Sequence, residues 1–168
     1  MKLTGYQIQH LAREKTTLIE TLVSQFRART KVFPGDPEPH LEALGLQIQK
    51  EETALAKLQT IQTRYNLRVE VSVEGVTMPL AEAVKSVGGA GRLEKIWRDL
   101  AAPRKDRYSL DRDERQEGTV VAKAAVSSEE ALVLSKKAAK RASALREAIQ
   151  IGNATAIAFD NVPDSLFE

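Results

Sequence analysis

One proline-rich stretch decides the fold: Phe33-Pro34-Gly35-Asp36-Pro37-Glu38-Pro39-His40. Its prolines cannot lie inside a helix, because each lacks a backbone N–H and disfavours the α conformation of the residue before it. On both sides, residues recur at alternating spacings of three and four, which places them on one helix face. Before the stretch this face comprises Ile8, Leu11, Lys15, Leu18, Leu22 and Gln25, and after it Leu41, Leu44, Ile48, Glu51, Leu55, Leu58, Gln62 and Tyr65. The sequence therefore predicts an antiparallel hairpin of two helices, over residues 3–31 and 40–65.

The pattern changes after the second helix. Apolar and polar residues alternate from Leu67 to Val73, which is typical of a strand with one buried face, and Gly75 permits the turn that ends it. Thr77 is expected to cap a third helix that carries Pro79 in its first turn. A second strand is predicted over Thr119–Val126.

Three glycines interrupt the third helical pattern, at Gly88, Gly89 and Gly91. Each glycine costs roughly 1 kcal/mol inside a helix, so the sequence predicts a break or sharp bend there. A helical pattern resumes from Arg92 to Ala102, with Leu93, Ile96, Trp97 and Leu100 on one side. Pro103 ends it.

The last helix begins with a capping-box signature, Ser127 with Glu130, and is expected to run to about Ile151. Gly152 and Asn153 suit a left-handed C-terminal cap. Its inner face is built of mostly small residues: Ala131, Ser135, Ala138, Ala142, Leu145 and Ile149. The predicted fold is mostly α (α+β with a minor two-stranded sheet), in the order ααβαβα. A single helical domain spans 1–153, with the hairpin at 3–65 and a βαβα part at 66–153, followed by an acidic tail at 154–168.

Composition excludes several classes of protein. The 168 residues carry 25 basic and 23 acidic side chains, a balance that argues against a nucleic-acid partner. There is no cysteine, and the two histidines, His10 and His40, have no acidic cluster beside them, so we expect no metal site and no cofactor. Neither a signal peptide nor a membrane span is apparent, so a cytoplasmic location is expected.

Short motifs along nearly the whole chain resemble the septicolysin-like bacterial family of small helical-hairpin proteins. The matching residues are Met1–Leu3, Lys31–Glu38, Asn66, Gly75, Leu80–Ala83, Asp106–Ser109, Ile149–Gln150 and Asn153. The resemblance implies the fold and self-association, and it implies no activity. This chain departs from the family at its glycines 88–91, which interrupt a helix that is continuous there, and in its longer C-terminal extension from Ala154.

The first candidate site is Arg107-Tyr108-Ser109, with Arg104 nearby. A guanidinium, a phenol ring and a hydroxyl together suit an anionic, ring-bearing ligand such as a nucleotide. The alternative is a solvated loop whose cations pair with the acidic residues around them.

The second candidate site is Gly89, Gly91 and Arg92, at the expected start of a helix. Free N–H groups and the helix dipole bind anions at such a start. The alternative interpretation of these glycines is a hinge or a tight packing contact.

No nucleophile–base pair or phosphate-binding loop is present, so the sequence predicts a protein that is not an enzyme. The apolar stripe Leu18, Ile19, Leu22, Val23 and Phe26 is wider than one partner helix covers, which favours a third helix or a second subunit. Together with the small-residue face of the last helix, it predicts a homo-oligomer. The first hypothesis is a non-catalytic homo-oligomeric helical protein that binds or sequesters a small anionic, nucleotide-like ligand. The second is a coiled-coil-like scaffold or assembly protein of a bacterium or phage.

Overall fold

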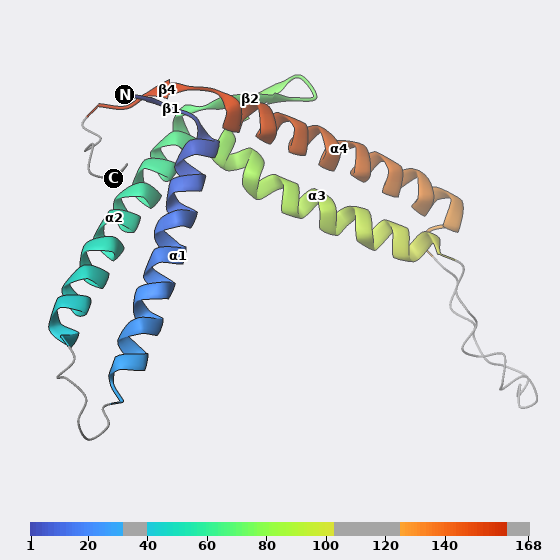
Figure 1. The fold of residues 1–168 in the computed structure, drawn as a ribbon. Coiled ribbons are helices and arrows are strands. Elements are labelled where there is room, and N and C mark those ends of the chain that lie inside the picture. The colour runs from blue at the N-terminus through green and yellow to red at the C-terminus, as the bar shows by residue number, and fades with distance from the viewer. Residues whose placement is uncertain (32–39, 103–124, 161–168) are drawn as a thin grey trace, which may run out of the picture.

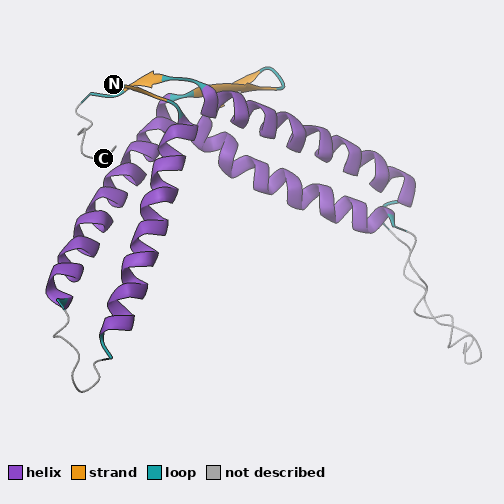
Figure 2. Ribbon diagram, in the orientation of Figure 1, coloured by secondary structure: helices purple, strands orange, loops and turns teal. Residues whose placement is uncertain are grey.

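The protein forms two helical hairpins that diverge from a common junction, as the computed structural model shows (Figure 1). The structure describes residues 1–31, 40–102 and 125–160. Helices α1 (Gly5–Arg29) and α2 (Leu41–Arg68) form the first arm, and α3 (Leu80–Ala101) and α4 (Ser128–Ala154) form the second. Strands β1 (Lys2–Leu3) and β4 (Ile157–Ala158) lie at the junction, and β2 (Glu70–Val73) and β3 (Val76–Pro79) form a hairpin that extends from it alongside α4 (Figure 2). The predicted class, mostly α with minor sheet, is confirmed, but the order is βααββααβ.

The first arm matches the predicted hairpin, with α1 shorter and α2 longer than expected. The side chain of Thr4 accepts a hydrogen bond from the backbone N–H of Gln7 and the side chain of Gln7 accepts one from that of Thr4, so α1 begins at Gly5. The inner face of α2 is buried or half-buried as predicted. The face of α1 is rotated: Ile19 and Leu22 are buried, whereas Leu18 and Gln25 are exposed.

The strand that follows α2 pairs with a strand that the sequence analysis assigned to a helix. Val69, Val71 and Val73 are buried, as the alternation predicts. The partner of β2 is β3, antiparallel, with Val73 opposite Val76. Glu74 and Gly75 both have positive φ, which is the geometry of a tight two-residue hairpin turn. The prediction of Thr77 as a helix cap is therefore wrong: Thr77 lies in β3, and α3 begins at Leu80.

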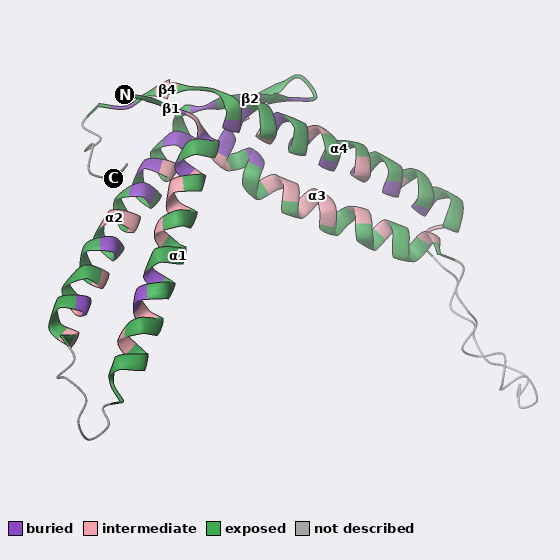
Figure 3. Ribbon diagram, in the orientation of Figure 1, coloured by how far each residue is buried: buried purple, intermediate pink, exposed green. Residues whose placement is uncertain are grey.

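Helix α3 is continuous across Gly88, Gly89 and Gly91, so the predicted break is wrong. Along its length it packs against α4, whose buried face consists largely of small side chains (Figure 3). The seam includes a hydrogen bond from the Ser135 hydroxyl to the Glu94 carbonyl, 3.4 Å. Close packing by small residues of α4 offsets the low helix propensity of the glycines.

Helix α4 begins as predicted and ends later. Ser127 and Glu130 form the capping box, in which each side chain bonds the other residue's backbone N–H. The helix continues through Gly152 and Asn153, so the expected left-handed cap is wrong: Glu74 and Gly75 hold the positive φ values among the described residues. Of the predicted strand Thr119–Val126, residues 119–124 lie outside the described residues, and Ala125 and Val126 are not in a strand.

Ser127→Ala is expected to lower the free energy of unfolding by about 1 kcal/mol, because the N–H of Glu130 loses its capping acceptor. Denaturant unfolding monitored by circular dichroism measures the change. The control is Ser143→Ala, an exposed position inside α4, where alanine should be neutral or slightly stabilising. Equal effects of the two substitutions would contradict the capping assignment.

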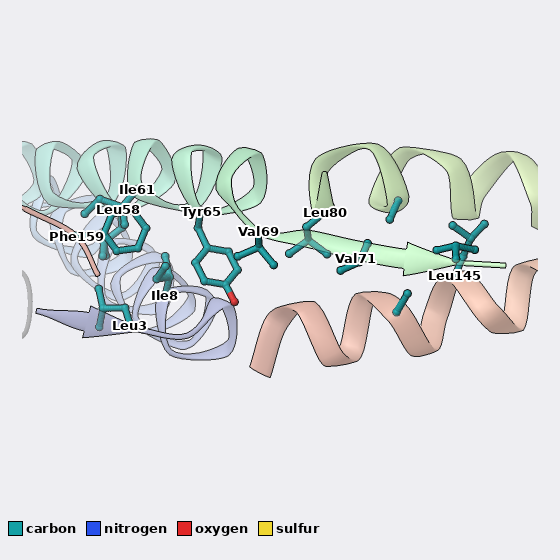
Figure 4. Close-up of a cluster of buried hydrophobic side chains, with 13 residues drawn as sticks. Leu3, Ile8, Leu58, Ile61, Tyr65, Val69, Val71, Leu80, Leu145 and Phe159 are labelled. Carbon is teal, nitrogen blue, oxygen red and sulfur yellow. The ribbon is translucent and has the colours of Figure 1, made fainter. Parts of the chain in front are cut away.

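The main hydrophobic core lies at the junction, where α1 and α3 begin and α2 and α4 end (Figure 4). We call this region the hub; its fully buried large side chains are Tyr65, Ile8, Leu58, Leu80 and Leu145. Strand β1 pairs with β4, which brings Phe159 into the core beside the Tyr65 ring, with centroids 6.4 Å apart. The region assigned to a C-terminal tail thus includes a strand and a buried aromatic residue.

Candidate functional site

The predicted anion site at the glycines is not formed. Gly89, Gly91 and Arg92 lie in the middle of α3, where the backbone N–H groups belong to the helix, so there is no free helix N-terminus to bind an anion. Arg104, Arg107, Tyr108 and Ser109 lie outside the described residues. The described part of the chain therefore brings none of the predicted ligand-binding residues together into a site.

The α3 glycines are not required by packing within the chain. Among the described residues, a Cβ added at Gly89 or Gly91 would meet no atom within 4 Å, and at Gly88 it would meet only the Arg92 guanidinium, at 3.6 Å. None of the three has positive φ. Glycine costs roughly 1 kcal/mol inside a helix, and within the described part of one copy neither a close contact nor an unusual backbone conformation requires glycine at these three positions.

A row of large apolar side chains continues from Gly89 along the outer surface of α3. Leu93, Ile96 and Leu100 are 46%, 54% and 44% exposed, although they are among the most hydrophobic residues of the arm. Gly89, Leu93, Ile96 and Leu100 follow at spacings of four, three and four, so they share one helix face. We call these four residues the α3 stripe. Exposed apolar residues gathered on one face mark an interaction surface more often than isolated ones do.

Two opposite charges flank the α3 stripe on the same side, Arg92 and Asp99. They are seven residues apart, which places them nearly in line along the helix. Both are exposed, and among the described residues neither forms an ion pair. The stripe therefore has a basic end near the hub and an acidic end towards the tip of the arm.

A shallow groove of about 710 Å³ lies at the tip of the second arm, around the start of α4. Its lining includes Val126, Val133 and Leu134 together with Glu129 and Glu130. The Glu130 carboxylate accepts hydrogen bonds from the backbone N–H of Ser127, which has the larger effect, and from the Ser127 hydroxyl. These bonds lower the pKa of the Glu130 carboxyl and keep it ionised. Two carboxylates beside the groove disfavour an anionic ligand.

The first arm contains a charged pair in its seam. Lys15 of α1 and Glu51 of α2 lie 3.0 Å apart (Nζ to Oε2), with side chains only 14% and 11% exposed. Oε2 of Glu51 has no well-aligned hydrogen bond, so the contact is an ion pair without hydrogen-bond geometry. The sequence analysis singled out both residues on the helical faces, and a polar pair in a seam fixes the register of two helices.

At the hub, Tyr65 packs closely against the backbone at two glycines, Gly5 and Gly152. The Tyr65 hydroxyl lies 2.5 Å from the carbonyl of Gly152, in the last turn of α4, and 2.6 Å from the carbonyl of Thr155, just after the helix. Burial raises the pKa of the Tyr65 phenol, and a backbone hydrogen bond with Gly5 opposes that change, so the phenol stays a neutral donor. A Cβ at Gly5 would lie 2.4 Å from Asn153 Oδ1 and 2.8 Å from the Tyr65 ring. This close packing is structural and leaves no space for a ligand between Gly5, Asn153 and the Tyr65 ring.

Within the described residues, no group of three or more histidine, aspartate and glutamate side chains is placed to hold a metal ion. None of the helices in that part of the chain is long and apolar enough to cross a bilayer.

Comparison with known proteins supports the fold alone. No family model matches the chain, and no curated protein matches it. A solved structure described as a functionally unknown conserved protein from Corynebacterium diphtheriae is similar, with a TM-score of 0.64 and 20% sequence identity. The match covers 94% of this chain and 100% of that one. The match therefore shows that the fold is shared with that protein, and the resemblance to septicolysin-like proteins stays a prediction.

Proposed function

We propose that this protein is a non-catalytic scaffold that associates with copies of itself through its helical arms. The observation that carries the proposal is the α3 stripe, three large apolar side chains about half-exposed on a thin helical arm. The shape supports it as well, because the core is concentrated in the hub while both arms extend away from it (Figure 3). Extended helical arms with an apolar face are typical of proteins that assemble by helix–helix packing.

The competing hypothesis is the binding of a small anionic, nucleotide-like ligand. It now rests on Arg104 and Arg107–Ser109, outside the described residues, since α3 offers no helix start at Gly89–Arg92. The groove at the tip carries carboxylates where an anion site needs positive charge. The geometry of the described residues therefore favours the scaffold.

Multi-angle light scattering of the purified chain tests the proposal. The expected mass at micromolar concentration is a multiple of 18.5 kDa, without any added ligand. Absorbance at 260 nm and mass spectrometry of material released on denaturation are measured on the same sample. A mass of 18.5 kDa throughout the concentration range would contradict the scaffold, and a released nucleotide would favour the ligand hypothesis.

A further inference from the structure

The α3 stripe has a sequence order that suits an antiparallel pairing with itself. This inference rests on the proposed function, and adds which surface pairs and in which direction. Gly89 and Leu100 end the stripe, and Leu93 and Ile96 lie between them. When two copies run antiparallel, the first residue of one stripe faces the last residue of the other, and the two middle residues face each other.

We infer that two copies of this chain associate through α3 in an antiparallel pair, with Gly89 of each copy against Leu100 of the other. In this register Leu93 of each copy faces Ile96 of the other. The seam therefore has four layers, two of Gly89 against Leu100 and two of Leu93 against Ile96. Leu100, 44% exposed, enters the space that a side chain at position 89 would occupy. The open surroundings of Gly89, where a Cβ meets nothing within 4 Å in the described part of its own chain, fit this use.

The flanking charges are complementary in the same register. The two-fold axis passes between residues 92 and 99, so Arg92 of each copy faces Asp99 of the other. The two-fold symmetry repeats this contact, so the pair contains two Arg92–Asp99 contacts. In a parallel pair, by contrast, the Arg92 and Asp99 side chains of the two copies lie on opposite flanks of the seam, so the opposite charges do not come together. Charge complementarity therefore selects a second copy, and selects its direction.

Reversing one charge at a time tests the pairing. Arg92→Asp places acidic residues at both flanking positions, and Asp99→Arg places basic residues at both. Each variant alone is expected to self-associate about tenfold more weakly than the parent at low salt, because two attractive contacts become repulsive. An equimolar mixture of the two is expected to recover the parent's association, since every facing pair is then opposite in charge. Sedimentation equilibrium measures the association constants of the parent, of each variant and of the mixture.

A matched control changes the same charge elsewhere on the arm. Lys140→Asp, exposed on α4 on the face opposite Ala138, alters the net charge as much as Arg92→Asp and should leave association unchanged. Circular dichroism confirms that each variant keeps the parent's helix content. In about 1 M salt the differences among the charge variants should disappear, because the Debye length falls to about 3 Å.

The outcomes separate this inference from the proposed function. A monomeric parent would contradict both. A parent that self-associates, with Arg92→Asp and Asp99→Arg as strongly associated as Lys140→Asp, would contradict the antiparallel α3 pair and leave self-association standing. Recovery in the mixture, with weak association of each variant alone, supports the pair in the stated direction.

Discussion

Gly152→Ala is expected to lower the free energy of unfolding by about 1–3 kcal/mol, as overpacking of a close-packed core does. A Cβ at this position would lie 2.7 Å from Cγ1 of Val71 and 3.0 Å from Cδ1 of Leu80. Both neighbours are buried hub residues, on β2 and at the start of α3, so neither can move away without disturbing the core. The same glycine contributes the carbonyl that meets the Tyr65 hydroxyl.

The matched control is Gly45→Ala, another glycine within a helix. A Cβ at Gly45 meets nothing within 4 Å, so this substitution should raise the free energy of unfolding by about 0.5–1 kcal/mol through helix propensity alone. Urea unfolding followed by circular dichroism gives both values. If the two variants are stabilised alike, the close approach of α4 to β2 and α3 is wrong.

Glu51→Leu is expected to destabilise the protein by about 3 kcal/mol, because it leaves the Lys15 ammonium in the seam of the first arm without its partner. Lys15→Met alone should also destabilise, since the Glu51 carboxylate then loses its counter-charge. The double variant Lys15→Met/Glu51→Leu removes both charges and fills the space with apolar atoms. Its stability should lie within about 1 kcal/mol of the parent's, or above it.

The double-mutant cycle decides whether Lys15 and Glu51 interact in the folded protein. A coupling free energy of roughly 2 kcal/mol or more is expected for an ion pair so little exposed. Additive effects of the two single substitutions would contradict the pairing of α1 with α2 in this register. Because the pair lies away from the α3 stripe, none of these variants should alter the parent's state of association.

The first arm was predictable because its signals are local. Prolines block a continuous helix between residues 33 and 40, and the spacing of α2 identifies its buried face. The buried face of α1 was not predictable from spacing alone, because Leu18 and Ile19 are adjacent and similarly apolar. The choice of Ile19 depends on how α2 packs against it, which the spacing in α1 alone does not specify.

The errors in the second arm come from contacts between elements, which the pattern of a single segment does not show. Thr77 and Pro79 match a helix start as well as they match a strand, and pairing with β2 decides for the strand. The glycines of α3 disfavour a helix locally, but contact with the small residues of α4 keeps the helix continuous. Strands β1 and β4 have two residues each, too few to show an alternation.

The candidate site was predictable only in part. The sequence singles out Gly89 and Arg92, but it predicts that they bind an anion at the start of a helix. That prediction is wrong, because both residues lie inside α3. Leu93, Ile96 and Leu100 were assigned to a helical pattern, yet their exposure depends on which face of α3 meets α4, and no local signal specifies that. Two residues of the stripe predicted to self-associate, Ile19 and Leu22, are buried within the first arm, so the proposal of self-association rests on the α3 stripe instead.

Electron–electron distance measurement between spin labels tests the central claim most directly, because the chain has no cysteine and a single introduced one labels specifically. Lys85→Cys and Lys95→Cys are both exposed on α3, the second close to the inferred two-fold axis. At about 1.5 Å per residue, antiparallel association separates the Lys85 labels by about 30 Å along the helix and the Lys95 labels by almost nothing. The account predicts a longer intermolecular distance at position 85 than at position 95. Equal short distances at both positions, or no intermolecular distance at either, would contradict it.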